Sequence, residues 1–441
     1  MELRFLGGAR EVGRSAVLVN DSLLLDYGLM TGNPPRLPID SVDPDAVVVS
    51  HGHLDHVGAV PTLCSGPRRP PIHWTPPTYE LTQLLARDTL KLHGGSYRCP
   101  FTEEELRRVA QVSETHGYGE PFEAAGHEVT FFNAGHIPGS AHVLVDDGET
   151  RLLYTGDFYV PGSSSSSSTA QPTRPDEPGR TDHSGNPIYG QRLVPSSTAR
   201  PEADVIITES TYADIEHEDR AVIEARFVER VQTTLWEGGS VVVPAFAIGR
   251  TQELLLVCSA HGIPCYVDGM GKQVTRLLEH HPTFVRDATA LRRAVSHARF
   301  VTGQDGQRRR IAREGAVIVT TAGMLSGGPA MTYIPAVCDD PTNLIAFTGY
   351  QVEGTPGRDL LDTGSVTIDG RRMPVSARVE SYDFSAHADA RGLRSLLDSY
   401  RDANVLVGHG DDATGFAAAL RKDGFDANAP EVGDVVVYSP S

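Results

Sequence analysis

Residues 50–58 read Ser-His-Gly-His-Leu-Asp-His-Val-Gly and directly follow the apolar run Ala46–Val49. A short continuous apolar run of this kind predicts a buried strand. Four side chains that can bind a metal ion leave the end of this strand within six positions: His51, His53, Asp55 and His56. Neutral imidazoles and a carboxylate are ligands that suit a borderline cation such as Zn²⁺. The stretch therefore predicts a metal centre at the end of the strand.

The spacing within this stretch favours two metal ions. His51 and His53 alternate by two and can face one ion from the end of the strand. Asp55 and His56 come one turn further on and can face a second ion. Gly52 is expected to let the backbone turn tightly between the two pairs. A lone histidine is more often a surface or core residue, but four possible ligands in this order outweigh that interpretation.

The pattern His-x-His-x-Asp-His resembles that of the metallo-β-lactamase fold hydrolases. Three further stretches match the first, third and fourth motifs of that family in the family's order: residues 26–28 with Asp26, residues 134–140 with His136, and residues 152–158 with Asp157. The resemblance implies that Asp26 orients the ligands by accepting a hydrogen bond, that His136 is a ligand, and that Asp157 bridges both ions.

A longer likeness singles out one branch of that family. Glu209-Ser210-Thr211-Tyr212, the stretch 382–389 with His387, and the stretch 405–411 with His409 resemble motifs A, B and C of the β-CASP nucleases. The stretches 244–255, 322–328 and 349–355 look like the archaeal cleavage and polyadenylation specificity factors of that branch. Because the chain begins directly at its first strand, it resembles the form without N-terminal KH domains.

The resemblance implies an α/β fold, namely an αββα metallo-β-lactamase sandwich with an inserted α/β β-CASP domain. Residues 1–209 and 376–441 are expected to form the sandwich. Residues 210–375 are expected to form the insertion, because strands and helices alternate there as in a parallel-sheet unit. Residues 162–200 are rich in serine and proline and are expected to form a mobile insertion that folding does not require.

By the same resemblance the site holds two Zn²⁺ ions. One ion would have the ligands His51, His53, His136 and Asp157, and the other Asp55, His56, Asp157 and His409. His387 would act as general acid, with Asp55, Asp157, Glu209 and Asp26 completing the catalytic set. Arg250, Ser326 and Gly327 lie in loops expected to contact the phosphates of the substrate. The cluster Arg308–Arg313 could meet RNA or could be a solvated helix face, and His93 and His116 are expected to be surface residues.

The resemblance implies a zinc-dependent ribonuclease that hydrolyses single-stranded RNA, as an endonuclease in 3′-end processing or RNA decay. A 5′-3′ exoribonuclease of the same family is the first alternative, and an RNA-binding subunit of a processing complex with little catalysis is the second. A small-molecule hydrolase of this fold would lack the insertion and motifs A to C. DNA-processing relatives carry valine at the position of His409, so the histidine favours RNA.

The composition adds constraints on surroundings and partners. The net charge is −18, and Lys91, Lys272 and Lys422 are the only lysines among 39 basic residues. This composition resembles the acidic, lysine-poor proteins of a high-salt cytoplasm, although an acidic enzyme that avoids nucleic acid is an alternative. Five cysteines without a C-x-x-C pair, and no long apolar stretch, favour a reducing cytoplasm and no membrane partner. The family leaves open a homodimer and an association with RNA-decay or transcription-termination machinery.

Overall fold

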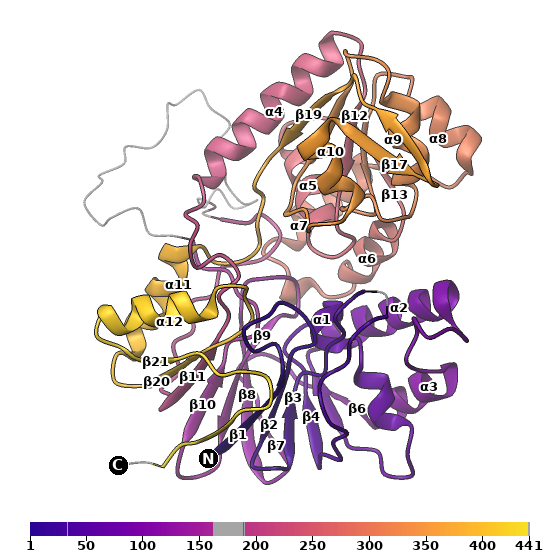
Figure 1. Cartoon of the computed structure of the whole chain (residues 1–441). Coiled ribbons are helices and arrows are strands. Elements are labelled where there is room, and N and C mark those ends of the chain that lie inside the picture. Colours follow the sequence, from indigo (N-terminus) through magenta and orange to yellow (C-terminus); the bar gives the residue numbers. More distant parts are fainter. Residues whose placement is uncertain (33, 162–187, 189, 440–441) are drawn as a thin grey trace. The chain divides into compact units, whose positions relative to one another are not determined.

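The structure is a computed structural model, and it describes residues 1–32, 34–161, 188 and 190–439. The chain divides into two compact units, coloured along the sequence in Figure 1. The first unit comprises residues 1–166, 196–216 and 387–441, and the second comprises 167–195 and 217–386. The changes of unit at 216 and 386 lie 6 and 11 residues beyond the expected boundaries at 210 and 375.

Within the described residues, the first unit contains two seven-stranded sheets. The first sheet has the spatial order β22 (Val435–Val437), β1 (Glu2–Gly7), β2 (Ala16–Val19), β3 (Leu23–Leu25), β4 (Ala46–Val48), β5 (Ile72–Trp74) and β6 (Ser113–Thr115). The second sheet has the order β21 (Asp426–Asn428), β20 (Asn404–Val407), β11 (Val205–Thr208), β10 (Arg151–Tyr154), β9 (Ala141–Asp146), β8 (His127–Asn133) and β7 (Pro121–Ala124).

Successive side chains on the central strands pack alternately against the other sheet and against the outer helices. Val48 of β4 belongs to the apolar cluster between the two sheets, whereas Val47 and Val49 belong to the cluster on the outer face of the first sheet. In β10, Leu152 faces the other sheet and Leu153 faces the outer helices. Because successive side chains of a strand point to opposite faces, a strand buried on both faces needs a continuous apolar run. The runs in the sequence have this origin.

Helices cover the outer faces of both sheets, which completes the expected αββα sandwich. The helices that follow strands of the first sheet are α1 (Leu54–Val57), η1 (Val60–Cys64), α2 (Pro76–His93) and α3 (Glu103–Val112). The outer face of the second sheet packs against α11 (Ala390–Leu397), η3 (Asp398–Tyr400) and α12 (Ala413–Lys422). Residues 190–195, between β10 and β11, already belong to the second unit; the chain enters that unit again after β11 and returns before α11.

The second unit is the expected parallel-sheet α/β domain. Its main sheet has the order β14 (Arg299–Phe300), β13 (Cys265–Asp268), β15 (Val317–Thr320), β12 (Val241–Pro244), β16 (Leu344–Phe347) and β19 (Arg378–Ser381), with every neighbouring pair parallel. A hairpin is formed by β17 (Ser365–Ile368) and β18 (Arg371–Pro374). The helices are α4 (Arg220–Trp236), α5 (Arg250–Ala260), α6 (Gly271–Leu278), η2 (Pro282–Phe284), α7 (Ala288–His297), α8 (Asp305–Ile311), α9 (Ala330–Val337) and α10 (Pro356–Thr363).

The prediction of a mobile insertion over residues 162–200 is wrong for its last part. Residues 162–187 and 189 lie outside the described residues, but Arg192, Leu193 and Val194 are buried in the second unit. Arg192 pairs with Glu224 of α4, and Glu253 of α5 accepts hydrogen bonds from the backbone N–H groups of Arg192 and Leu193. The prediction failed because Glu224 and Glu253, which hold this segment, lie far from it in the sequence. The composition of the segment gives no sign of these partners.

Two further properties follow from the described residues. None of their helices combines the length and the apolar character that crossing a membrane requires. All five cysteines are free and buried.

Candidate metal centre

The ligand-rich stretch leaves β4 and enters α1, a helix of four residues that begins at Leu54 and carries Asp55 and His56. The loop after β3 approaches it closely, because a Cβ on Gly28 would lie 1.7 Å from the carbonyl oxygen of Asp55. Gly52 has a different role from the tight turn expected of it. Its φ is not positive, and its Cβ would lie 3.1 Å from Cβ of Leu81, so a small residue there lets α2 pack closely.

The first expected ligand set comes together in the structure. His51, His53, His136 and Asp157 each offer one ligand atom, and these atoms lie within 4.8 Å of one another. His51 Nε2 is 3.5 Å and His136 Nε2 is 3.8 Å from Asp157 Oδ2. His53 Nδ1 is 3.0 Å from His136 Nε2. Two tetrahedral ligands about 2.0–2.2 Å from a zinc ion lie roughly 3.3–3.6 Å apart, and the three observed distances of 3.0, 3.5 and 3.8 Å lie around that separation.

The second expected set also comes together, around the other oxygen of Asp157. His56 Nε2 is 3.4 Å and His409 Nε2 is 3.6 Å from Asp157 Oδ1, while Asp55 Oδ2 is 3.6 Å from His409 Nε2. His409 follows β20 with a φ of 34°, in the left-handed region, and Ser15 Oγ lies 3.0 Å from its Nδ1. The two oxygens of Asp157 thus face different histidine groups, as a bridging carboxylate requires.

Buried polar atoms at the centre indicate that the residues fit metal ions. His51 Nε2, His56 Nε2 and Asp157 Oδ1 are buried and have no hydrogen-bond partner among the described residues. A buried polar atom without a partner costs about 1–3 kcal/mol. Because these atoms converge on the same small volume, divalent cations would satisfy all of them at once.

The electrostatics differ between the ligands. Burial lowers the pKa of His56, but Asp157 and Asp26 outweigh it and raise that pKa well above its ordinary value, whereas His53 and Asp157 have the charges of metal ligands. Burial lowers the pKa of His53 to about 4, which leaves its imidazole neutral and able to donate a lone pair to a metal. Burial alone would raise the pKa of Asp157, but His409, His56 and His51 outweigh it and hold that pKa well below the ordinary value. Asp157 is therefore an ionised carboxylate.

Asp26 contacts His56 of the second ligand set, and the orienting role that the family resemblance implies for it stays a prediction. Its Oδ2 lies 2.7 Å from His56 Nδ1 and accepts hydrogen bonds from Ser50 Oγ and Tyr154 Oη, and its Oδ1 accepts from Ser50 N–H. This arrangement leaves Nε2 of His56 to face Asp157. The sequence reasoning missed Ser15, Ser50 and Tyr154. A polar residue beside a ligand motif could have drawn attention to Ser50 and Tyr154, but no local signal indicates Ser15.

Glu209 and His387 form a pair beside the ligands. Glu209 follows β11 and accepts a hydrogen bond from Phe158 N–H through Oε1 and one from His387 Nδ1 through Oε2, over 2.7 and 2.9 Å. Burial lowers the pKa of His387, but the Glu209 carboxylate outweighs it and raises that pKa to about 9. The His387 ring lies 4.4 Å from the His136 ring between centroids, and its Nδ1 is committed to Glu209.

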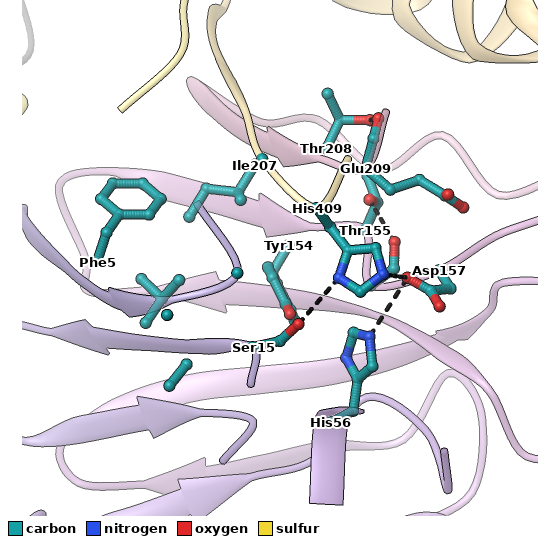
Figure 2. A pocket seen from close by; sticks show the side chains of 16 residues that line it. Phe5, Ser15, His56, Tyr154, Thr155, Asp157, Ile207, Thr208, Glu209 and His409 are labelled. Carbon is teal, nitrogen blue, oxygen red and sulfur yellow. Dashed lines mark hydrogen bonds and ion pairs between the residues drawn. The ribbon is translucent and has the colours of Figure 1, made fainter. Parts of the chain in front are cut away.

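Figure 2 shows the pocket next to the second ligand set. His56, Asp157 and His409 point toward one another, and Ser15 reaches the far nitrogen of His409. Glu209 and Tyr154 belong to the same lining. The centre is thus built from the ends of strands in both sheets of the first unit.

The three expected phosphate contacts belong to the second unit. Ser326 is exposed, but the side chain of Arg250 is largely buried and donates to the carbonyl oxygen of Thr348. Arg250 therefore holds the loop after β16, and its contact with substrate stays a prediction, as do those of Ser326 and Gly327. In the basic cluster, Arg308 pairs with the buried Asp268, which gives one of its arginines a structural role.

Comparison with known families divides the chain in the same way. Residues 10–185 match the metallo-beta-lactamase superfamily, and residues 251–360 match the Beta-Casp domain. Residues 372–430 match the Zn-dependent metallo-hydrolase RNA specificity domain.

Similar proteins span almost the whole chain. The RNase aCSPSF2 of Saccharolobus solfataricus is 33% identical over 98% of this chain and 85% of its own length. The probable RNase MJ4 of Methanocaldococcus jannaschii is 30% identical over 99% of this chain and 100% of its own length. The transcription termination factor FttA of Methanothermobacter thermautotrophicus is 30% identical over 93% of this chain and 67% of its own length. A crystal structure of a protein of unknown function from Enterococcus faecalis shares the fold, with a TM-score of 0.58, 12% identity and 99% coverage of both chains.

The sandwich and the converging histidine and aspartate ligands define a hydrolase that binds divalent metal ions. The chain belongs to the metallo-β-lactamase superfamily, and within it to the β-CASP family.

Proposed function

We propose that this protein is a zinc-dependent endoribonuclease that hydrolyses single-stranded RNA in RNA processing or transcription termination. The observation that carries the proposal is the convergence of both ligand sets on Asp157, whose two carboxylate oxygens face separate histidine groups. Two zinc ions fit this arrangement, one with each set. Bound there, they would supply activation of water and stabilisation of the charge that develops on a phosphodiester.

The protein's own groups would orient the ligands and move one proton. Asp26 fixes His56, and Ser15 holds the ring of His409. Glu209 anchors His387 through Nδ1 and so sets the direction of the rest of its ring. We assign to His387 the donation of a proton from Nε2 to the departing 3′-oxygen. The ligand sets already account for the other site histidines.

Family membership supports RNA as the substrate class. The RNA specificity domain matches residues 372–430, and the similar proteins include named RNases. His409 supports RNA over DNA, because the DNA-processing relatives carry valine there. The complete ligand sets argue against an RNA-binding subunit without catalysis.

The wider partners are also part of the proposal. The relatives named as termination factors support an association with transcription-termination or RNA-decay machinery. We further propose that two copies can associate and that the enzyme acts in the cytoplasm, where free cysteines are the rule.

One assay separates the endonuclease from its alternatives. Purified protein is incubated with a circular single-stranded RNA, its DNA counterpart and a linear RNA with a 5′-monophosphate. The Asp157→Ala variant serves as a control against contaminating nucleases. Cutting of the RNA circle with little action on DNA is the expected result. Degradation of the linear 5′-monophosphate RNA alone would instead establish the exonuclease, preference for DNA would overturn the substrate class, and binding without cutting would support the subunit role.

A further inference from the structure

A second group of metal-binding side chains lies outside the site described above, at the edge of the first sheet. Strand β6 is the last strand of that sheet (Figure 1). It pairs in parallel with β5, with His73 opposite Glu114. His116 follows β6, and its N–H donates to the carbonyl oxygen of Trp74. Since Glu114 and His116 are two residues apart in extended chain, both lie on the same side as His73.

These three side chains converge closely. His73 Nδ1 lies 3.0 Å from His116 Nε2 and 3.8 Å from Glu114 Oε2, and one ligand atom from each residue lies within 4.8 Å of the others. The nitrogen–nitrogen distance equals the 3.0 Å between His53 and His136 in the first ligand set. The same chain therefore places two imidazole nitrogens at the same separation at both locations, although the ring planes meet at 80° for His53 and His136 and at 35° for His73 and His116.

The surroundings hold the two rings in place and keep one side open. Phe122 of β7, the edge strand of the second sheet, stacks on His116 with ring centroids 3.7 Å apart and lies 5.1 Å from His73. His73 is buried, His116 is half-buried and Glu114 is exposed. His116 is thus not the surface residue that the sequence predicts, and an ion could enter from the side of Glu114.

We propose that His73, Glu114 and His116 form a further site for a divalent cation of the zinc class, separate from the catalytic centre. Two imidazoles and one carboxylate suit Zn²⁺, whereas Mg²⁺ and Ca²⁺ prefer oxygen ligands alone. A fourth position would be left to water. The ion joins β5 to the edge strand β6 and so protects an edge that would otherwise fray. The competing interpretation is a hydrogen bond between two neutral imidazoles with no ion.

Metal content of the full chain distinguishes the two interpretations. Protein stripped of metal is equilibrated with micromolar free Zn²⁺, and bound zinc is measured by inductively coupled plasma mass spectrometry. Glu114→Gln and His116→Gln are each expected to bind about one equivalent less than the unchanged protein. Glu123→Gln, an exposed glutamate on β7, and His280→Gln, an exposed histidine, are the matched controls and should lose none.

A thermal readout supports the same test independently of RNA cleavage. Addition of Zn²⁺ should raise the melting temperature of the unchanged protein more than that of His116→Gln, because only the former gains the β5–β6 ion. Equal zinc content and equal thermal shifts in all four variants and the unchanged protein would overturn the site and leave the hydrogen-bonded imidazole pair. The comparison counts a difference in zinc content, so it does not depend on how many ions the catalytic centre holds.

Discussion

His387 donates a hydrogen bond from Nδ1 to Oε2 of Glu209 over 2.9 Å, although 178 positions separate the two residues. Glu209 directly follows β11, and His387 lies where the chain returns from the second unit. The second unit therefore lies between the two members of the pair in the sequence. In the proposed mechanism this pair moves a proton and binds no metal, and this division of roles can be tested.

His387→Ala is expected to lower the cleavage rate by about 10²- to 10⁴-fold, the usual contribution of a general acid. Zinc content and RNA affinity should stay unchanged, because His387 belongs to neither ligand set. Single-turnover cleavage, metal analysis and a binding titration measure the three quantities. Loss of zinc in this variant would show that His387 is a ligand.

Glu209→Gln should lower the rate less than His387→Ala. Glutamine can still accept the hydrogen bond from Nδ1 but no longer supplies the negative charge that favours protonated His387. Cleavage by the double variant should equal that of His387→Ala alone, because Glu209 is expected to act through the histidine. A double variant that is slower than His387→Ala by the full effect of Glu209→Gln would assign Glu209 a separate role.

Asp157→Ala is expected to lose metal as well as activity, since one carboxylate faces both ligand sets. Asp402→Ala, a change at an exposed aspartate of the same unit, provides the control and should keep both. Elemental analysis after dialysis measures the metal. Two retained equivalents in Asp157→Ala would rule out the bridging assignment.

Asp26→Ala should destabilise the protein by about 3–5 kcal/mol, because it leaves Ser50, Tyr154 and His56 without their buried acceptor. Asp26→Asn keeps the shape and should cost less stability. Both variants should bind the second zinc about 10- to 100-fold more weakly, the usual effect of removing the partner of a ligand. Denaturant unfolding and zinc titration give these values, and an unchanged zinc affinity would contradict the orienting role.

Arg192→Ala should also cost about 3–5 kcal/mol, because it leaves Glu224 as a buried charge without its arginine. The control is Arg226→Ala on α4, the helix that carries Glu224. It removes an exposed pair with Glu218 and should cost at most about 1 kcal/mol. Chemical unfolding of both variants measures the difference. Equally small losses would mean that residues 190–195 do not anchor the segment to the second unit.

The net charge of −18 predicts an unusual dependence on salt. An acidic surface repels RNA, and this repulsion reaches further as salt is removed, since the Debye length grows to about 30 Å at 0.01 M. Cleavage should therefore persist or improve toward molar salt, whereas a basic protein would lose affinity by counterion release. Initial rates across that range test this, and a steady fall with salt would show that local basic contacts dominate.

Much of this protein could be predicted from the sequence because its chemistry follows short apolar runs. A continuous apolar run such as Ala46–Val49 fits a strand that is buried on both faces, so it indicates a central strand. The ligands that follow it then lie where that strand ends. The αββα fold and the inserted parallel-sheet domain follow from such runs together with the family motifs. The ligand residues could be proposed from the same motifs.

Only the tertiary structure decided which distant groups meet. Ser15 reaches His409, Tyr154 reaches Asp26, and Glu253 holds the backbone at Arg192. No local pattern specifies these pairs, because a hydrogen bond between residues far apart depends on the packing of sheets and helices and not on neighbouring residues. The same holds for His73 and His116, which are unremarkable in sequence and come within 3.0 Å of each other only because β6 pairs with β5.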